Sequence, residues 1–180
     1  MSRCARIRRP RRPGLVLALF AAVALGGPAA PAAGAEEGEV RIGELTDLDR
    51  RYMAQQRQDL DELAREQLGA SFSGRTDDDI ALLERLLAEG VVTADDRRLL
   101  QGMGIVLGDL LAAALDMHWV IYTDDVGRSR ALRYRDSDHY LFPVTMISRR
   151  RQAGDTTPVA AVYAKAVAII EPLQEPLPFQ

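Results

Sequence analysis

The chain has 180 residues, of which 47 % are hydrophobic and 27 % charged, and this is the composition of one ordinary globular domain. Its formal net charge of -3 hides an asymmetry, because six arginines and no acidic residue precede residue 36. The remainder carries 23 less 6, or 17, basic residues against 26 acidic ones. Such an acidic body argues against nucleic acid and anionic lipid as partners, since both bind basic surfaces.

Residues 1–35 have the three-part anatomy of a secretory signal peptide. A basic segment is followed by an apolar run over 14–25 and by a small-residue stretch that ends Ala33-Gly34-Ala35. The apolar run is shorter than the roughly 20 residues that a membrane span needs. We therefore predict cleavage near Ala35, no transmembrane segment afterwards and a location in the periplasm or outside the cell; an uncleaved anchor is the alternative. The one cysteine, Cys4, lies before the cleavage site, so the mature chain has no thiol.

The first half of the mature chain predicts a short lead and an amphipathic helix. Residues 36–44 are polar and contain glycine, which is typical of a flexible lead. Thr46 then begins a helix with Asp49 as its acidic capping partner, and Gly69 ends it. Residues 55–57 of this helix are expected on its exposed side.

A second helix is predicted from Thr76 to Gly90. Its first turn holds Asp77, Asp78 and Asp79, and these three acids complement the positive end of the helix dipole. Metal binding is the alternative interpretation of this acidic run.

The stretch 99–115 predicts a central helix that is apolar on nearly every side and must be covered by the other elements. Gly102, Gly104 and Gly108 interrupt it, each at a cost of about 1 kcal/mol relative to Ala. We attribute them to the close approach of another helix or of the sheet. Their spacing mimics a dinucleotide-binding fingerprint, which would however need a strand before it and a turn through the glycines. Asp109 is the only charge in this apolar run and is expected where the helix meets solvent.

Three strands are predicted next, and they form an antiparallel meander with one face on the helices. Trp119 lies in the first strand and is expected in the core. Gly127 supplies the positive φ of the first turn, and Pro143 places the end of the third strand at the sheet edge or beyond the ladder. The three strands span residues 118–123, 130–135 and 139–144.

The C-terminal part adds two helices and a tail. The first helix covers 145–152, and the second begins at Thr157-Pro158, reaches 170 and is expected to be buried. Prolines in 172–180 then leave a disordered tail. The whole pattern predicts a single α+β domain over roughly 45–171, with helices packed on a small three-stranded meander.

Residues 99–150 resemble an uncharacterised bacterial family, domain of unknown function 3806. The matching segments are Gly-Ile-Val-Leu-Gly-Asp (104–109), Trp119-Val120, the Asp-Asp-Val-Gly turn (124–127), Ala131-Leu132 and Phe142-Pro143-x-Thr-Met-Ile-Ser-Arg-Arg (142–150). The family often has Glu-Tyr-Gly where this chain has Asp125-Val126-Gly127, and Asp-Pro where it has Ser129-Arg130. The resemblance implies a domain and no established activity.

Two groups of residues are candidates for a site. Arg149, Arg150 and Arg151 could clamp a carboxylate or phosphate bidentately; alternatively they pair with the protein's own acids, such as those at 77–79. His118 and His139, with Asp136 and Asp138, could form a metal site of nitrogen and oxygen ligands. No spacing among these four matches a known metal motif, and exposed positions near strand ends are the simpler interpretation.

These observations favour an exported, non-enzymatic protein that binds an unidentified protein partner in the envelope, through Arg149 to Arg151. No cofactor is implied. A metal-assisted hydrolase using His118, His139 and the nearby aspartates is the second hypothesis. A small-molecule pocket between the central helix and the sheet, admitted by the glycines, is the third.

Overall fold

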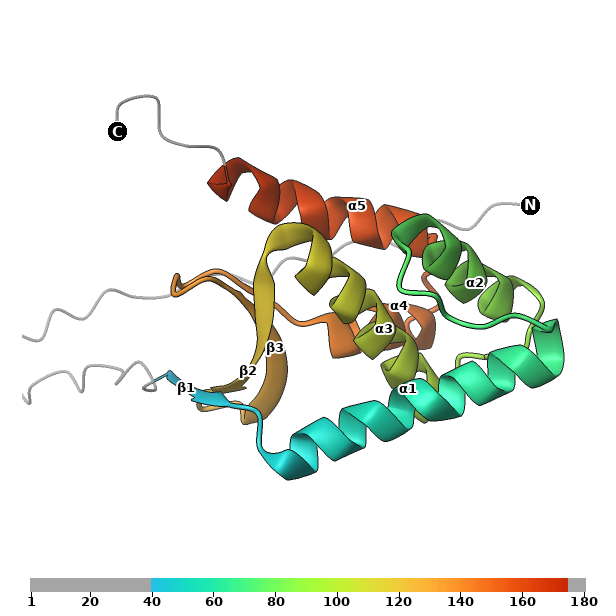
Figure 1. The fold of residues 1–180 in the computed structure, drawn as a ribbon, viewed down its shortest axis with the longest axis horizontal. Coiled ribbons are helices and arrows are strands. Elements are labelled where there is room, and N and C mark those ends of the chain that lie inside the picture. Colours follow the sequence, from blue (N-terminus) through green and yellow to red (C-terminus); the bar gives the residue numbers. More distant parts are fainter. Residues whose placement is uncertain (1–39, 175–180) are drawn as a thin grey trace, which may run out of the picture. The chain divides into compact units, whose positions relative to one another are not determined.

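The computed structural model describes residues 40–174, which form two layers (Figure 1). One layer is a four-stranded antiparallel sheet of order β1-β2-β3-β4, and the other is made of helices. The elements are β1 Arg41–Glu44, α1 Asp47–Leu68, α2 Thr76–Ala88, α3 Arg97–Leu115, β2 Met117–Thr123, β3 Arg128–Tyr134, β4 Tyr140–Leu141, α4 Pro143–Gln152, α5 Val159–Ile170 and a 3-10 turn Glu171–Leu173. The predicted α+β class is confirmed, with four strands instead of three. The predicted signal peptide, 1–35, lies outside the described residues.

The core is built around α3, which contacts the four other helices and strands β2 and β3. Met103, Ile105, Leu107 and Leu111 on different sides of the helix are all fully buried. Within residues 40–174, α3 is the one helix whose length and composition would suffice to cross a membrane, and 61 % of its most apolar window is buried inside the domain. A core helix passes the same test, so the result is weak as an indication of a membrane span.

The glycines of α3 face three different neighbours. A Cβ on Gly104 would overlap the carbonyl oxygen of Pro143 and lie 2.8 Å from that of Val144, so the main chain of α4 occupies this space. A Cβ on Gly108 would meet the Trp119 ring, and one on Gly102 would lie 3.2 Å from the carbonyl oxygen of Gln56. The three glycines thus allow α4, β2 and α1 to approach one helix closely.

The prediction that residues 36–44 form a flexible N-terminal segment is wrong for residues 41–44, which form strand β1. Residues 41–44 pair with β2 in the register Arg41 opposite Thr123 and Glu44 opposite Val120. Main-chain hydrogen bonds hold an edge strand whatever its side chains are, so the polar sequence of this segment did not exclude pairing. Residues 36–39 lie outside the described part.

The third predicted strand is shorter than expected, because the chain becomes helical at Pro143. Only Tyr140 and Leu141 pair with β3. Pro143 is the first residue of α4, a position that suits its fixed φ and its missing N–H. The helix consequently starts two residues earlier than predicted.

Two helices bury different faces from those predicted. Gln56 of α1, expected on the exposed side, is only 2 % exposed. In the amide orientation that satisfies both groups, it donates to the Arg98 carbonyl oxygen and accepts from the Arg98 guanidinium. Helix α5, predicted as a buried helix, buries only one face, and Ile169 is exposed. The Glu84 carboxylate of α2 accepts from the main-chain N–H of Ala160, which is one of the N–H groups in the first turn of α5 that have no partner within the helix.

The predicted disordered tail is ordered at its start. The Tyr134 hydroxyl donates to the carbonyl oxygen of Leu173 at 3.4 Å, and the Gln174 side-chain amide donates to that of Leu115 at 2.9 Å. These contacts place residues 172–174 against the domain. The rest of the predicted tail, 175–180, lies outside the described residues.

The substitution Gly104→Ala is expected to destabilise the domain by about 1–3 kcal/mol, the cost of overpacking a core, because main-chain atoms of α4 cannot give way as a side chain would. Chemical denaturation monitored by circular dichroism measures it. Gly43→Ala is the matched control, since nothing lies within 4 Å of the Cβ it would add. Equal stability of the Gly104→Ala variant and the control would contradict this account of the packing.

Candidate functional site

A cleft of about 420 Å³ opens where the β2–β3 hairpin meets the first turn of α4. Its volume is within the range of about 300–1,000 Å³ typical of ligand sites. It is lined by Tyr122, Asp124, Val126, Gly127, Arg128, Ser129, Arg130, Phe142, Val144, Thr145 and Arg149. Three arginines and one aspartate make this lining basic, in contrast to the acidic chain around it.

The hairpin end is held by the turn that the sequence predicts at 124–127. The carboxylate of Asp124 accepts from the main-chain N–H groups of Val126 and Gly127, both at 3.0 Å. Gly127 has φ +141°, in the region that glycine adopts most readily. One wall of the cleft therefore has a defined main-chain conformation.

Asp49 positions the two arginines on β3. Its side chain is 3 % exposed. The carboxylate accepts from Arg128 at 3.0 and 2.5 Å and lies 2.8 Å from Nη2 of Arg130. Thr46 closes the predicted capping box by donating its main-chain N–H to the same carboxylate at 3.0 Å. Hydrogen bonding to Arg128 holds the pKa of Asp49 well below its usual range, and burial opposes that shift. Both guanidinium groups are thus fixed from α1.

The predicted arginine cluster divides into two parts. Arg150 donates to the carbonyl oxygen of Met146 at 2.6 Å and lies 3.9 Å from the Asp155 carboxylate, and Arg151 donates to the Thr157 carbonyl oxygen at 3.3 Å. Both side chains therefore fasten the end of α4 to the loop that follows it.

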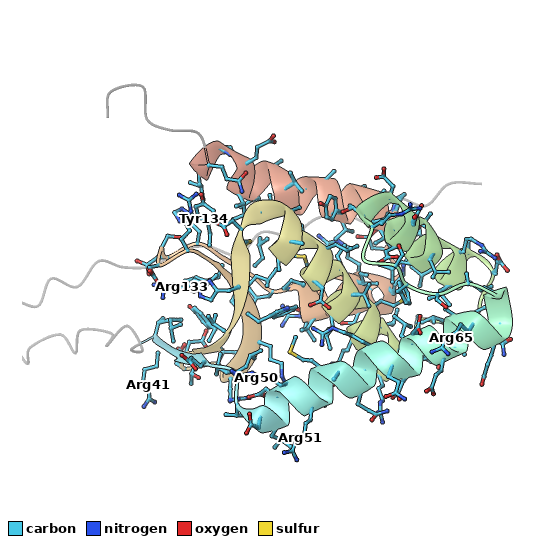
Figure 2. The ribbon with its side chains drawn as sticks, viewed as in Figure 1. Arg41, Arg50, Arg51, Arg65, Arg133 and Tyr134 are labelled. Carbon is cyan, nitrogen blue, oxygen red and sulfur yellow. The ribbon has the colours of Figure 1, made fainter. Side chains whose placement is uncertain are left out.

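Arg149, by contrast, is exposed and lines the cleft. Within residues 40–174 its side chain makes no ion pair or hydrogen bond. Exposed Arg41 and Arg51 lie on the outer surface of β1 and α1 and do not line the cleft (Figure 2).

The alternative pairing of the arginine cluster with 77–79 does not occur. Asp78 pairs with Arg75. Asp79 is buried and accepts from the N–H groups of Ser73 and Gly74 at 2.7 and 2.8 Å. These acids organise the start of α2 and the loop before it.

An aromatic group borders the cleft on the sheet side. The Tyr122 ring meets Phe142 edge-on at 5.3 Å between centroids, and it meets Tyr140 at 5.1 Å. Tyr122 and Phe142 line the cleft. A ligand would therefore meet cationic and apolar surface together.

The predicted metal site is not assembled. His118 lies opposite Arg133 in the β2–β3 register, and Arg133 lies opposite Tyr140, so a cation stands between His118 and the segment that carries His139. Asp136 lies 3.8 Å from Arg133, and Asp138 is at 3.5 Å from the Tyr140 hydroxyl. In the part of the chain that the structure describes, no group of three or more His, Cys, Asp or Glu could hold a metal ion.

Asp109 is partly exposed, in agreement with its expected place where α3 meets solvent, and it also bridges to two other elements. It accepts from the indole Nε1 of Trp119 at 2.9 Å and from the Arg57 guanidinium, so it joins α3 to β2 and α1. A second cleft, of about 490 Å³, lies beside it between α1, α3 and the loop after α1. The charged residues there are already paired or hydrogen-bonded, which makes it the weaker candidate for binding an ionic ligand. The glycines of α3 line neither cleft.

Residues 79–163 match the sequence model of the family described as "Domain of unknown function (DUF3806)", which confirms the resemblance and extends it on both sides. All lining residues of the basic cleft lie within the match, whereas Asp49 lies before it. A crystal structure of a protein from Bacteroides thetaiotaomicron VPI-5482 has a similar fold, with a TM-score of 0.65 and 15 % identity, over 73 % of this chain and 48 % of that one. This chain thus spans about half the length of that protein. No curated protein matches the sequence.

The Asp49→Asn variant is expected to lose on the order of 1–3 kcal/mol of stability at neutral pH, because a buried charged acceptor is removed. The folded-state pKa of Asp49 is lowered, so its contribution is present above the unfolded pKa of about 3.9 and is lost as pH falls below it. The difference in unfolding free energy between wild type and variant should therefore shrink as the pH falls from about 5 to 2. Urea denaturation over this range measures it, and a difference independent of pH would contradict the assignment.

Removing the Asp109 carboxylate should be visible in the fluorescence of Trp119, the only tryptophan. In Asp109→Ala the indole N–H loses its acceptor, so we expect a shifted emission maximum and about 1 kcal/mol lower stability. The control Asp125→Ala changes an exposed turn residue. Identical spectra of the Asp109→Ala variant and wild type would show that the indole does not depend on this bond.

Proposed function

We propose that this chain, whose residues 79–163 carry the DUF3806 domain, is an exported binding protein that recognises an acidic group of its partner in the basic cleft. The group is a carboxylate or a phosphate, and the partner is a protein of the bacterial envelope. The proposal assigns binding and no catalysis to the cleft.

The observation that carries this proposal is the state of Arg149. An exposed guanidinium with no partner among residues 40–174 lines a cleft whose two other arginines are fixed by Asp49. A guanidinium binds carboxylate or phosphate through two parallel hydrogen bonds, and this pairing is stronger than a contact between neutral groups. The first turn of α4, which also lines the cleft, favours negative charge through its dipole.

The sequence of 1–35 supports the exported location. Its basic, apolar and small-residue segments have the order of a secretory signal peptide, with cleavage near Ala35. We place the mature protein in the periplasm or outside the cell on this ground.

The metal-assisted hydrolase is the less favoured function. It requires His118, His139, Asp136 and Asp138 to converge, and the register of the meander instead places Arg133 between the segments that carry the histidines. The small-molecule hypothesis is also less favoured at its original place, because Pro143, Trp119 and Gln56 fill the space beside the α3 glycines.

Arg149→Ala is expected to weaken the binding of inorganic phosphate and of the peptide acetyl-Val-Glu-Val-Glu-amide about tenfold, which corresponds to a loss of about 1.4 kcal/mol from one charge-assisted pair. Isothermal titration calorimetry at low salt measures both. The thermal midpoint should change little, because the Arg149 side chain makes no ion pair or hydrogen bond within the described residues.

Arg51→Ala is the matched control, since Arg51 is exposed on α1 outside the cleft. An Arg149→Ala variant that binds both probes like the wild type would refute the site. An equal loss in Arg51→Ala would show that binding is attraction to charge in general.

A further inference from the structure

The strand β3 has an open edge inside the basic cleft. Its pairing with β2 extends from Arg128 to Tyr134, whereas β4 pairs only with Leu132 and Arg133. The part of β3 from Arg128 to Ala131 is therefore paired on one side only. Arg128, Ser129 and Arg130 of this part line the cleft.

The direction of the free main-chain groups follows from the hydrogen bonds on either side. The N–H of Tyr134 donates to His139 in the segment that leads into β4, and Gly127 exchanges hydrogen bonds with Asp124 at the hairpin end. Because N–H and C=O groups alternate between the two edges of a strand, Arg128 and Arg130 direct theirs toward the open edge. Within residues 40–174 these groups have no strand partner.

The open edge is the place that β4 would occupy if it continued. Extending the register Leu132 opposite Leu141 would bring the residues after Leu141 beside Ala131 and Arg130. The chain instead turns into α4 at Pro143, and Val144 and Thr145 become the far wall of the cleft. The cleft therefore lies between β3 and α4, with Arg128, Ser129 and Arg130 on the strand side.

The usual protection of a sheet edge is only partial at the open part of β3. Charged side chains, proline or a bulge normally keep a second chain from pairing. The guanidinium groups of Arg128 and Arg130 are engaged by Asp49 of α1. Their charged ends are thereby directed toward α1, while 45 % of the Arg128 side chain and 24 % of the Arg130 side chain stay exposed. No residue of β3 itself is a proline.

We propose that the partner binds as a short acidic peptide segment in extended conformation, which adds a strand to the β3 edge at Arg128–Ala131 and places a carboxylate on Arg149. This inference rests on the proposed function and specifies its ligand. Main-chain hydrogen bonds to Arg128 and Arg130 would supply affinity, and alternate side chains would supply specificity.

Charge and surface complementarity select this occupant. The side chains of such a strand alternate between two faces, and the cleft offers Arg149 on the α4 wall and the rings of Tyr122 and Phe142 on the sheet side. A segment that alternates acidic and apolar residues satisfies both, whereas a basic segment would face three arginines. Peptides of the type Val-Glu-Val-Glu have this pattern.

The test is amide hydrogen exchange on the 15N-labelled protein, with acetyl-Val-Glu-Val-Glu-amide or inorganic phosphate at equal occupancy. We expect the peptide, and not phosphate, to slow exchange of the Arg128 and Arg130 amides at least tenfold. The Ser129 amide, which faces β2, should change little. The uncharged peptide acetyl-Val-Gln-Val-Gln-amide should bind at least tenfold more weakly.

Three other outcomes would overturn the proposal, and each refutes a different part of it. Peptide binding without slower exchange at Arg128 and Arg130, or binding of phosphate alone, would leave an anion site and refute strand addition. Equal affinity of the Gln peptide would refute the acidic specificity. Failure of both the peptide and phosphate to bind would refute the proposed function itself.

Discussion

The contact of Gly104 with the main chain of α4 determines how the second half of the domain is arranged. Because this position of α3 has no Cβ, the carbonyl groups of Pro143 and Val144 can lie directly against the central helix. The chain must therefore leave the sheet at Leu141 to reach that contact, and β4 has only two residues. The short β4 in turn leaves part of β3 without a neighbour, and the cleft occupies that space.

Asp49 of α1 fixes the arginines of β3 that form the other wall of the cleft. One carboxylate caps α1 through Thr46 and also pairs with Arg128 and Arg130, which belong to a strand far along the chain. Asp49 supplies one negative charge for these two guanidinium groups, so it fixes their position and still leaves one net positive charge beside the cleft. Arg149 lines the same cleft without an ion pair or side-chain hydrogen bond among residues 40–174, so a substitution there is the one by which we propose to test recognition apart from folding.

Local signals in the sequence predicted the elements that depend on local interactions. The capping box of Thr46 and Asp49, the apolar pattern of α3 and the turn ending at Gly127 all form as expected. The features that were missed depend on distant partners. Strand β1 is short, has Ile42 as its one apolar residue and is held by β2. Gln56 is buried because Arg98 of another helix satisfies its amide.

Of the three arginines in the cleft, the sequence pointed only to Arg149, because the contacts that define the cleft join distant parts of the chain. Three consecutive arginines look alike in a sequence, and only the positions of Asp155, Met146 and Thr157 distinguish Arg149 from its two neighbours. Arg128 and Arg130 were missed because nothing local links them to Asp49. Asp109 offered a usable signal, since a lone acid in an apolar helix needs a partner, and it has Trp119 and Arg57.

The pairing of β1 with β2 also sets the order in which the sheet can assemble while the chain is being made. Arg41 leaves the ribosome long before Thr123, its partner in the register, has been synthesised. Because the chain emerges from its N-terminus, α1 can become helical early, while β1 and the carboxylate of Asp49 wait for the hairpin. The sheet therefore closes late, through contacts of high sequence separation, which are the slow ones to form.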